Sequence, residues 1–292
     1  MKCFNYYKPK SLKEASEILL GYGEGAHILN GGTDLVVRMR DEITTPNAVV
    51  DIKGIKELYK MNYDGEDGLF IGACVKLTDM VHYGKVIENY RFLSDAAESI
   101  GAGQIRNLAT MVGNNCNASP LADTSTPLLV LDAIVVIYGP EGNREISIHE
   151  FFKGVRKICL GPGEIVTGIK VPAYENVDGV FMKNSRRKDM DLSTVCTSVG
   201  IINNNIHIAM GAVAPTPIRA WEAEKFVKGK SLTDEIINKT ASIATSESKP
   251  IDDVRSTKEY RREMVNVMVC RSLEKLRELR GEDYGVSNYV YT

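Results

Sequence analysis

The chain has 292 residues, which is enough for one large domain or two to three ordinary ones. Its hydrophobic content of 43% and charged content of 25% are typical of a globular protein that buries a core without disulfides, and its net charge of −2 gives no general attraction for nucleic acid or anionic membranes. No apolar run has the length of a membrane span, and the first ten residues lack a signal-peptide core, so we predict a cytoplasmic protein.

The first 40 residues predict a helix, a strand, a glycine-containing turn and a second helix. Residues 11–14 (SLKE) fit a capping box that starts an amphipathic helix to about Leu20. Residues 26–29 (AHIL) predict a strand and residues 35–40 (LVVRMR) a helix. The turn between them, residues 30–34 (NGGTD), could present free backbone N–H groups to an anion. A plain β-turn is the alternative, because Asn-Gly is common in turns, and neither the Rossmann fingerprint nor the P-loop lysine is present.

Short strands and helices alternate through the middle of the chain. Alternating or continuous apolar runs predict strands at residues 48–52, 69–73, 134–138, 144–148 and 164–171. Helices are predicted at residues 78–86, capped by Thr78, and at residues 91–100.

A polar stretch at residues 104–133 stands apart from these elements. It contains four asparagines and several hydroxyls, shows neither helical nor strand period, and then becomes apolar. A run of small hydrogen-bonding residues that leads into a buried element is typical of a loop that holds a polar ligand. An ordinary surface turn rich in Asn and Ser is the alternative.

The six cysteines and four histidines are dispersed, with no C-x-x-C pair and no H-E-x-x-H motif. Metal sites and iron–sulfur clusters need clustered ligands, so the spacing favours reduced, mostly buried thiols and no metal site in this chain.

The composition shifts near residues 173–179, where we place a boundary. Strands are predicted beyond it at residues 180–183, 194–203 and 206–213, then helices at 218–227, 232–245 and 256–279. The tail, residues 281–292, carries three tyrosines and is expected to be exposed. The pattern as a whole predicts an α+β protein in two parts.

Two segments taken together carry a family resemblance. Residues 29–35 (LNGGTDL), with residues 104–114 (QIRNLATMVGN) and 116–120 (CNASP), resemble the FAD-binding medium subunit of the molybdenum hydroxylases, most of all that of bacterial xanthine dehydrogenase. Residues 164–166 (EIV) and 214–219 (APTPIR) match as well, so the resemblance runs nearly end to end. It implies a vanillyl-alcohol-oxidase-like FAD-binding domain over residues 1–175, made of two α/β subdomains split near 55–60. It also implies a C-terminal domain over residues 176–292, with an antiparallel sheet and helices.

The resemblance also implies which residues bind FAD. Glycines in the first loop let the backbone approach the pyrophosphate, and a carboxylate at Asp123 contacts the ribose portion. Ile100 and Val166 fall at apolar positions that pack on the flavin, and Lys183 falls near a lysine close to the cofactor. The residues implied to bind FAD are Ile28, Leu29, Asn30, Gly31, Gly32, Thr33, Asp34, Leu35, Ile100, Thr110, Met111, Val112, Gly113, Asn114, Asp123, Val166 and Lys183. No catalytic residue is implied.

One position departs from the family pattern. The second loop of the family usually reads T-x-G-G-N, and here Val112 stands in place of the first glycine. A β-branched residue does not easily adopt positive φ. We therefore expect either an ordinary β backbone at Val112 or a slightly displaced FAD. The charged loop at residues 185–191 resembles the family's loop beside the isoalloxazine, with a solvated turn as the alternative.

The implied function is electron transfer within a heteromeric complex. A large subunit would hold molybdopterin and oxidise the substrate, a small subunit would hold two [2Fe–2S] clusters, and this chain would pass electrons through FAD, usually to NAD. One alternative is a stand-alone flavoprotein oxidoreductase of the same fold, which would need its own acid or base at the flavin. The sequence offers no paired carboxylates or histidine set for that role. The other alternative is a scaffold that has lost FAD.

Overall fold

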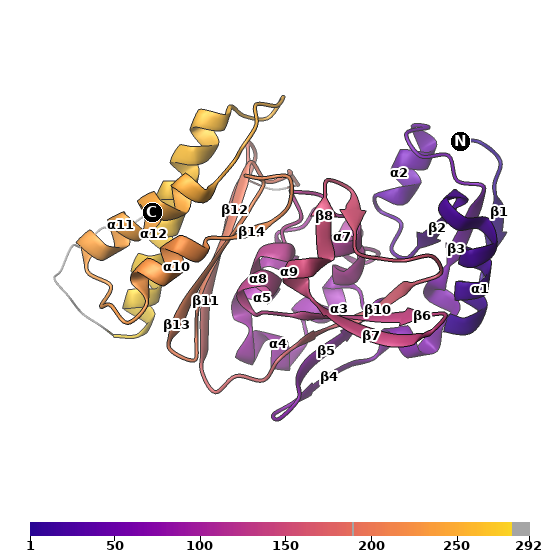
Figure 1. Ribbon diagram of the computed structural model, residues 1–292, viewed down its shortest axis with the longest axis horizontal. Helices are drawn as coiled ribbons and strands as arrows, with labels where there is room; N and C mark the ends of the chain where they lie inside the picture. The colour runs from indigo at the N-terminus through magenta and orange to yellow at the C-terminus, as the bar shows by residue number, and fades with distance from the viewer. Residues whose placement is uncertain (189, 282–292) are drawn as a thin grey trace.

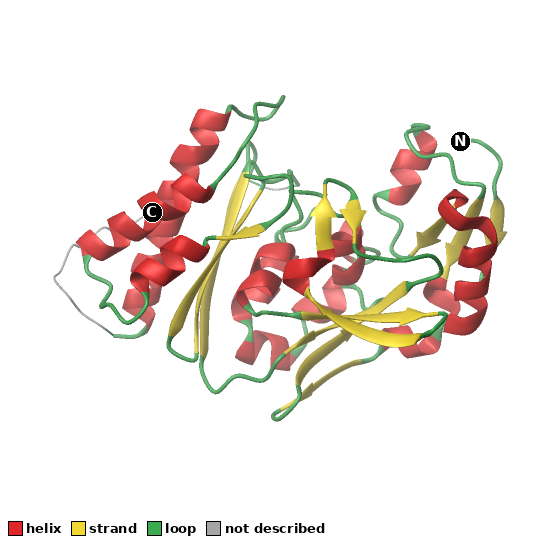
Figure 2. Cartoon of the chain, in the orientation of Figure 1, coloured by secondary structure: helices red, strands yellow, loops and turns green. Residues whose placement is uncertain are grey.

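The computed structural model of the protein describes residues 1–188 and 190–281. Three principal sheets follow one another along the long axis of the molecule, with helices packed on and between them (Figures 1 and 2). The α+β class predicted from the sequence is confirmed. The expected exposed tail lies, from residue 282 on, outside the described residues, as does one residue of the charged loop, 189.

The first sheet is parallel, with the order β1-β3-β2. Its strands are β1 (Asn5–Tyr7), β2 (Ala26–Leu29) and β3 (Ala48–Asp51), joined by α1 (Leu12–Tyr22), the short 3-10 turn η1 (Gly23–Gly25) and α2 (Leu35–Arg40). The start of α1 is capped as expected, because Ser11 Oγ accepts a hydrogen bond from the Glu14 backbone N–H at 3.2 Å. The strand β2 and the helix α2, on either side of the first loop, also have the bounds that the sequence predicts.

Two 3-10 turns, η2 (Ile52–Gly54) and η3 (Lys56–Tyr59), lead into the second sheet, which is antiparallel with the order β4-β5-β10-β6-β7. Its strands are β4 (Met61–Asp64), β5 (Gly68–Gly72), β6 (Ile134–Gly139), β7 (Gly142–Ser147) and β10 (Ile165–Val171). Its helices are α3 (Leu77–Val81), α4 (Gly84–Asn89), α5 (Arg91–Glu98), α6 (Gly103–Arg106), α7 (Met111–Cys116), α8 (Ser125–Val130) and α9 (Ile148–Phe151). A small hairpin, β8 (Phe152–Gly154) and β9 (Lys157–Ile158), follows α9.

The third sheet is antiparallel and consists of β11 (Val177–Asn184), β12 (Val195–Ile202), β13 (Asn205–Gly211) and β14 (Ile218–Arg219) in chain order. Helices α10 (Trp221–Val227), α11 (Asp234–Glu247) and α12 (Lys258–Leu279) pack together beside it, with α10 and α12 against its strands, while α5 and α8 also contact it (Figure 1). One apolar core fills the first two sheets and their helices, and another lies between the third sheet and its helices. Among the described residues, no helix combines the length and apolar character needed to cross a membrane.

Several expected elements differ from the structure. Residues 104–133, expected to be irregular, contain most of α6 and all of α7 and α8, because helices of four to six residues are too short to display a period. The helix expected at residues 78–86 is two helices, and Thr78 hydrogen-bonds Asn107 instead of capping. The helix expected from residue 218 begins at Trp221, because Ile218 and Arg219 pair with β13.

Candidate cofactor site

Two loops that are 80 residues apart in sequence are joined by one side chain. Asn30, directly after β2, donates from Nδ2 to Thr110 Oγ1 at 2.9 Å and to the Ala73 carbonyl at 2.5 Å. Thr110 Oγ1 also accepts from the Gly113 backbone N–H at 3.0 Å. The amide of Asn30 therefore fixes the first loop against the start of α7, as the pairing of the two sequence segments predicts.

The first loop has the shape of an anion cradle. In the described part of the chain, no protein acceptor is found for the backbone N–H groups of the five successive residues 31–35. Gly32 has φ +77°, and a Cβ on Gly31 would lie 2.3 Å from the Leu108 carbonyl oxygen. Successive free N–H groups of this kind bind anions, and a side chain at Gly31 would collide with the backbone of residues 108 and 109 in the second loop. The side-chain oxygen Asn30 Oδ1 is buried without a hydrogen-bond partner, which leaves it free for a ligand donor.

Within this loop, the side chains have different exposures. Ile28, Leu29, Thr33 and Leu35 are half-buried, whereas Asp34 is exposed at the start of α2 and makes no capping hydrogen bond. Asp34 is therefore the one charged side chain among residues 28–35, and the unpaired N–H groups of this loop belong to the backbone.

The second loop is a helix start, which corrects the expectation for Val112. Thr110 is the N-cap of α7, and the residues that follow it are helical, so Val112 has neither positive φ nor a β backbone. Val112 and Met111 are 2% and 1% exposed and pack into the main core. Valine is tolerated there because its side chain is buried in the main apolar core and its backbone is helical. Gly113 lies close to the first loop, since a Cβ on it would be 3.9 Å from Asn30 Nδ2.

The helix α7 is braced from behind by α8. Thr124 Oγ1 donates to Asn114 Oδ1 at 2.6 Å, and the buried Asn115 accepts from Ser125 Oγ at 2.9 Å. These hydrogen bonds engage polar side chains that made residues 104–133 resemble a ligand-binding loop. They also place Asp123, one residue before Thr124, at the end of the same network.

Asp123 lies at the junction of the second and third sheets. Its Oδ2 accepts from Lys183 Nζ of β11 at 2.8 Å, and its Oδ1 accepts from Ser193 Oγ. Lys183 Nζ also donates to the Ser99 carbonyl at 3.0 Å. Burial raises the pKa of the Asp123 carboxyl, and the ammonium of Lys183 opposes that rise. The structure thus brings Asp123 and Lys183 together, as neighbouring members of one buried cluster.

Ile100 and Val166, the two residues expected to pack on the flavin, differ in how deeply their side chains are buried. Ile100, beside Ser99, is half-buried, and its carbonyl accepts from Arg106 Nη1 at 3.1 Å. Val166 in β10 is 4% exposed and belongs to the main core, beside an irregularity in the pairing of β10 with β6.

Two basic residues near the first loop were missed by sequence reasoning. Lys53 donates from Nζ to the Asn30 carbonyl at 3.0 Å while it pairs with Asp51 at 2.9 Å. Arg156, at the turn of the β8–β9 hairpin, bonds Asn117 at the end of α7. Both are brought there by tertiary packing, and neither has a local motif that could have signalled it.

Comparison with known proteins places the chain in a family. Residues 2–174 match the family described as the FAD binding domain in molybdopterin dehydrogenase, and residues 181–276 match the CO dehydrogenase flavoprotein C-terminal domain. The chain belongs to this family of molybdenum hydroxylase flavoproteins. The resemblance predicted from the two loops is therefore confirmed, and with it FAD as the cofactor of the family's binding domain.

Individual relatives of this family cover nearly the whole chain. The glyceraldehyde dehydrogenase medium chain of Sulfolobus acidocaldarius is 32% identical over 94% of this chain and 98% of its own length. The xanthine dehydrogenase FAD-binding subunit of Escherichia coli O157:H7 is 30% identical over 93% and 95%. A chain of the carbon monoxide dehydrogenase structure from Hydrogenophaga pseudoflava superposes with a TM-score of 0.90 at 30% identity, over 94% of this chain and 96% of that one. The names of these relatives give different substrates, so the similarity supports the role of a flavoprotein subunit and does not single out one substrate.

Proposed function

We propose that the cradle at residues 31–35 and the start of α7 hold the pyrophosphate of FAD. The observation that carries this proposal is the Asn30–Thr110 hydrogen bond at 2.9 Å, which fixes two loops of the family's motif around one set of unpaired N–H groups. The residues assigned to the cofactor are the seventeen named from the sequence, with Met111 and Val112 contributing backbone only, because their side chains are buried in the core. Asp123 and Lys183 act at the sugar and flavin end.

The domain division follows the same assignment. We place the FAD-binding domain at residues 1–175, with its two subdomains meeting at the 3-10 turns around residues 55–60, and the C-terminal domain at residues 176–292. The separate apolar cores and the two family matches, which leave residues 175–180 between them, support this division.

We propose that the chain is the electron-transfer subunit of a heteromeric molybdenum hydroxylase of the xanthine dehydrogenase type. Its partners are a molybdopterin-binding large subunit and a small subunit with two [2Fe–2S] clusters, and its electron acceptor is NAD. Bound FAD would supply the step between one-electron carriers and a two-electron acceptor. The similarity to a xanthine dehydrogenase FAD-binding subunit over 93% of the chain supports the assembly.

This chain's own residues would hold and insulate the flavin. The side chains of Thr110 and Asn114 are engaged in structural hydrogen bonds, and the buried Asp123 is held by Lys183 and Ser193. These side chains would therefore serve position and local charge, while the free N–H groups of residues 31–35 would bind the cofactor. This arrangement fits a relay better than a flavoenzyme with its own acid–base chemistry.

The experiment that tests the proposal compares the chain alone with the assembled complex. Expressed by itself, the chain should be yellow with FAD and should not oxidise xanthine with a dye acceptor. With the large and small subunits, it should support xanthine-dependent NADH formation. Turnover by the chain alone would favour the stand-alone oxidoreductase, and activity of the complex on aldehydes but not on xanthine would move the assignment to another member of the family.

A further inference from the structure

Arg156 occupies the turn of the β8–β9 hairpin in a backbone conformation that few side chains adopt. Its φ is +60°, and the residue that it pairs with, Ala118, has φ +45°. The Arg156 backbone N–H donates to the Ala118 carbonyl at 2.9 Å, so the hairpin turn is fastened to the end of α7 (Figure 1). Left-handed backbone at a residue other than glycine persists only where the surroundings impose it, and it is common at ligand sites.

The guanidinium is held from one side only. Nη1 donates to the Asn117 carbonyl at 3.1 Å and also contacts Asn117 Oδ1. Within residues 1–188 and 190–281, no carboxylate lies within ion-pair distance of Arg156, and Nε and Nη2 have no hydrogen-bond acceptor. An arginine has five N–H donors, so most of this fork is available to a ligand.

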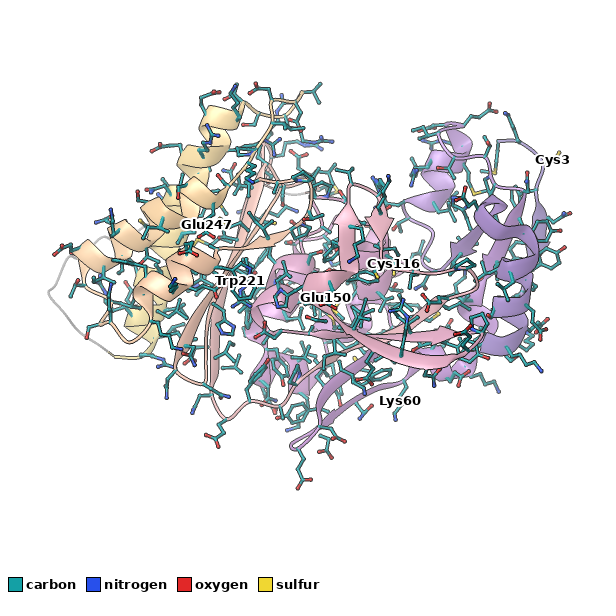
Figure 3. The ribbon with its side chains drawn as sticks, viewed as in Figure 1. Cys3, Lys60, Cys116, Glu150, Trp221 and Glu247 are labelled. Carbon is teal, nitrogen blue, oxygen red and sulfur yellow. The ribbon has the colours of Figure 1, made fainter. Side chains whose placement is uncertain are left out.

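The charges facing Arg156 come from the first loop and α2. Asp34 and Arg38 are its electrostatic neighbours, and burial lowers the pKa of the guanidinium while Asp34 raises it. Asp34 itself makes no capping hydrogen bond. Cys116, the last residue of α7, is labelled in Figure 3 near this hairpin, between the first sheet and the third. The Asn117 backbone N–H donates to the Gly113 carbonyl at 3.0 Å, so Arg156 lies one helical turn from Gly113, which is itself close to Asn30 of the first loop.

We propose that Arg156 is a phosphate-binding residue of the FAD site, which faces the cradle at residues 31–35 and donates its free N–H groups to the pyrophosphate. The inference rests on the FAD site proposed above. Backbone N–H groups attract a phosphate but supply no formal positive charge, whereas a planar guanidinium supplies one and matches phosphate oxygens with two parallel hydrogen bonds. Holding the guanidinium at Asn117 before the ligand arrives reduces the entropy lost on binding.

The alternative is a purely structural role, in which Arg156 caps the C-terminal end of α7 through the Asn117 carbonyl. The two roles differ in what they need. Capping needs one N–H and would be met by lysine, and its loss would lower the stability of the chain without cofactor. Phosphate binding needs the fork, and its loss would lower affinity for FAD and weaken the dependence of that affinity on salt.

The test uses the full chain freed of flavin and titrated with FAD by fluorescence, at low and high salt, with thermal unfolding of each apo-protein. Arg156→Gln should weaken FAD binding about tenfold to a hundredfold, the range of a charge-assisted hydrogen bond, and flatten the salt dependence. Arg156→Lys should recover part of the affinity. Lys157→Gln, which removes the same charge from the next residue of the hairpin, should stay within about twofold.

The outcomes separate the two proposals. If the wild-type chain does not bind FAD, the FAD site itself fails. If the wild-type chain binds FAD and Arg156→Gln binds it equally well, the assignment of Arg156 fails. If Arg156→Gln loses affinity only together with a large drop in apo-protein melting temperature and an unchanged salt dependence, Arg156 is a structural cap.

Discussion

Lys183 Nζ lies 2.8 Å from Asp123 Oδ2 and links β11 of the third sheet to the segment before α8. The side chains are 13% and 6% exposed, so the ion pair is almost wholly removed from water. A buried pair contributes little relative to an apolar pair of the same shape, but breaking it from one side leaves an isolated charge. The contact therefore predicts an asymmetry between single and double substitutions.

Lys183→Met should destabilise the apo-protein by about 3–5 kcal/mol, because it leaves the Asp123 carboxylate buried without its cation. The double variant Asp123→Asn with Lys183→Met removes both charges and should recover most of that loss. Urea unfolding of the two variants and the wild type measures the coupling. Additive losses in the double variant would show that the pair is not energetically linked.

Gly31→Ala should damage the first loop. The new Cβ would lie 2.3 Å from the Leu108 carbonyl oxygen and 2.9 Å from Ala109 Cα, so the backbone must shift at a cost of about 1–3 kcal/mol. FAD affinity should fall along with stability. Gly21→Ala in α1 is the matched control, because nothing lies within 4 Å of its Cβ position. That variant should be stabilised by roughly 0.5–1 kcal/mol with unchanged FAD binding. Equal FAD affinities for the two variants would contradict a close approach at residue 31.

Val112→Gly restores the glycine usual in the family and should nevertheless be harmful. Val112 is helical and 2% exposed, so the change opens a cavity and weakens α7, at about 2–4 kcal/mol. Val112→Ala keeps the helix and should lose less. Chemical denaturation of both variants gives the comparison, and tighter FAD binding by Val112→Gly would mean that the valine displaces the cofactor after all.

Asp132 gives the stability a dependence on acid pH. Burial raises the pKa of its carboxyl, but the hydrogen bond from His149 and the charges of Arg219 and His207 lower it by more. The pKa in the folded protein therefore lies below its usual value. A depressed carboxyl pKa stabilises the fold above the unfolded pKa of about 4, and this stability is lost as pH falls through the folded pKa. Unfolding free energies from neutral pH downward should show a steeper acid decline in the wild type than in Asp132→Asn, and parallel curves would refute the assignment.

This cluster joins elements that are far apart in the chain. Arg219 of β14 also makes a bidentate pair with Glu224 and lies 4.4 Å from the Trp221 ring centre, and that ring is 5.4 Å from the His149 ring. Figure 3 labels Trp221 and Glu150, the neighbour of His149, at this junction between the third sheet and α9. The acid sensitivity of Asp132 should therefore be visible in tryptophan fluorescence as well as in global unfolding.

Sequence reasoning predicted the elements around the first loop because local signals agree there. Ser11 caps α1, an apolar run makes β2, and the Asn-Gly turn leads directly into α2. It failed at residues 104–133 because the polar groups there bond across short helices: Asn115 with Ser125, and Thr110 with Asn30. Such bonds cross 10 to 80 residues and leave no period in the sequence.

The same limit explains the site residues that were missed or misjudged. The family pattern compares Val112 with the glycine that it replaces, whereas the structure shows a helical residue whose side chain is buried in the core. Lys53 lies in η2, directly after β3, and Arg156 lies in the β8–β9 hairpin, and the fold brings both segments to the first loop and α7. Recognition of the family located the two loops, and the tertiary structure was needed to tell backbone contacts from side-chain contacts.

The most direct test of the proposed relay is the path of electrons in the proposed three-subunit complex after removal of FAD from this chain. Xanthine-dependent reduction of a dye that accepts electrons from the iron–sulfur subunit should continue, NADH formation should stop, and added FAD should restore it at one FAD per chain. NADH formation at an unchanged rate without FAD, or loss of dye reduction together with FAD, would contradict a flavin relay between the iron–sulfur clusters and NAD.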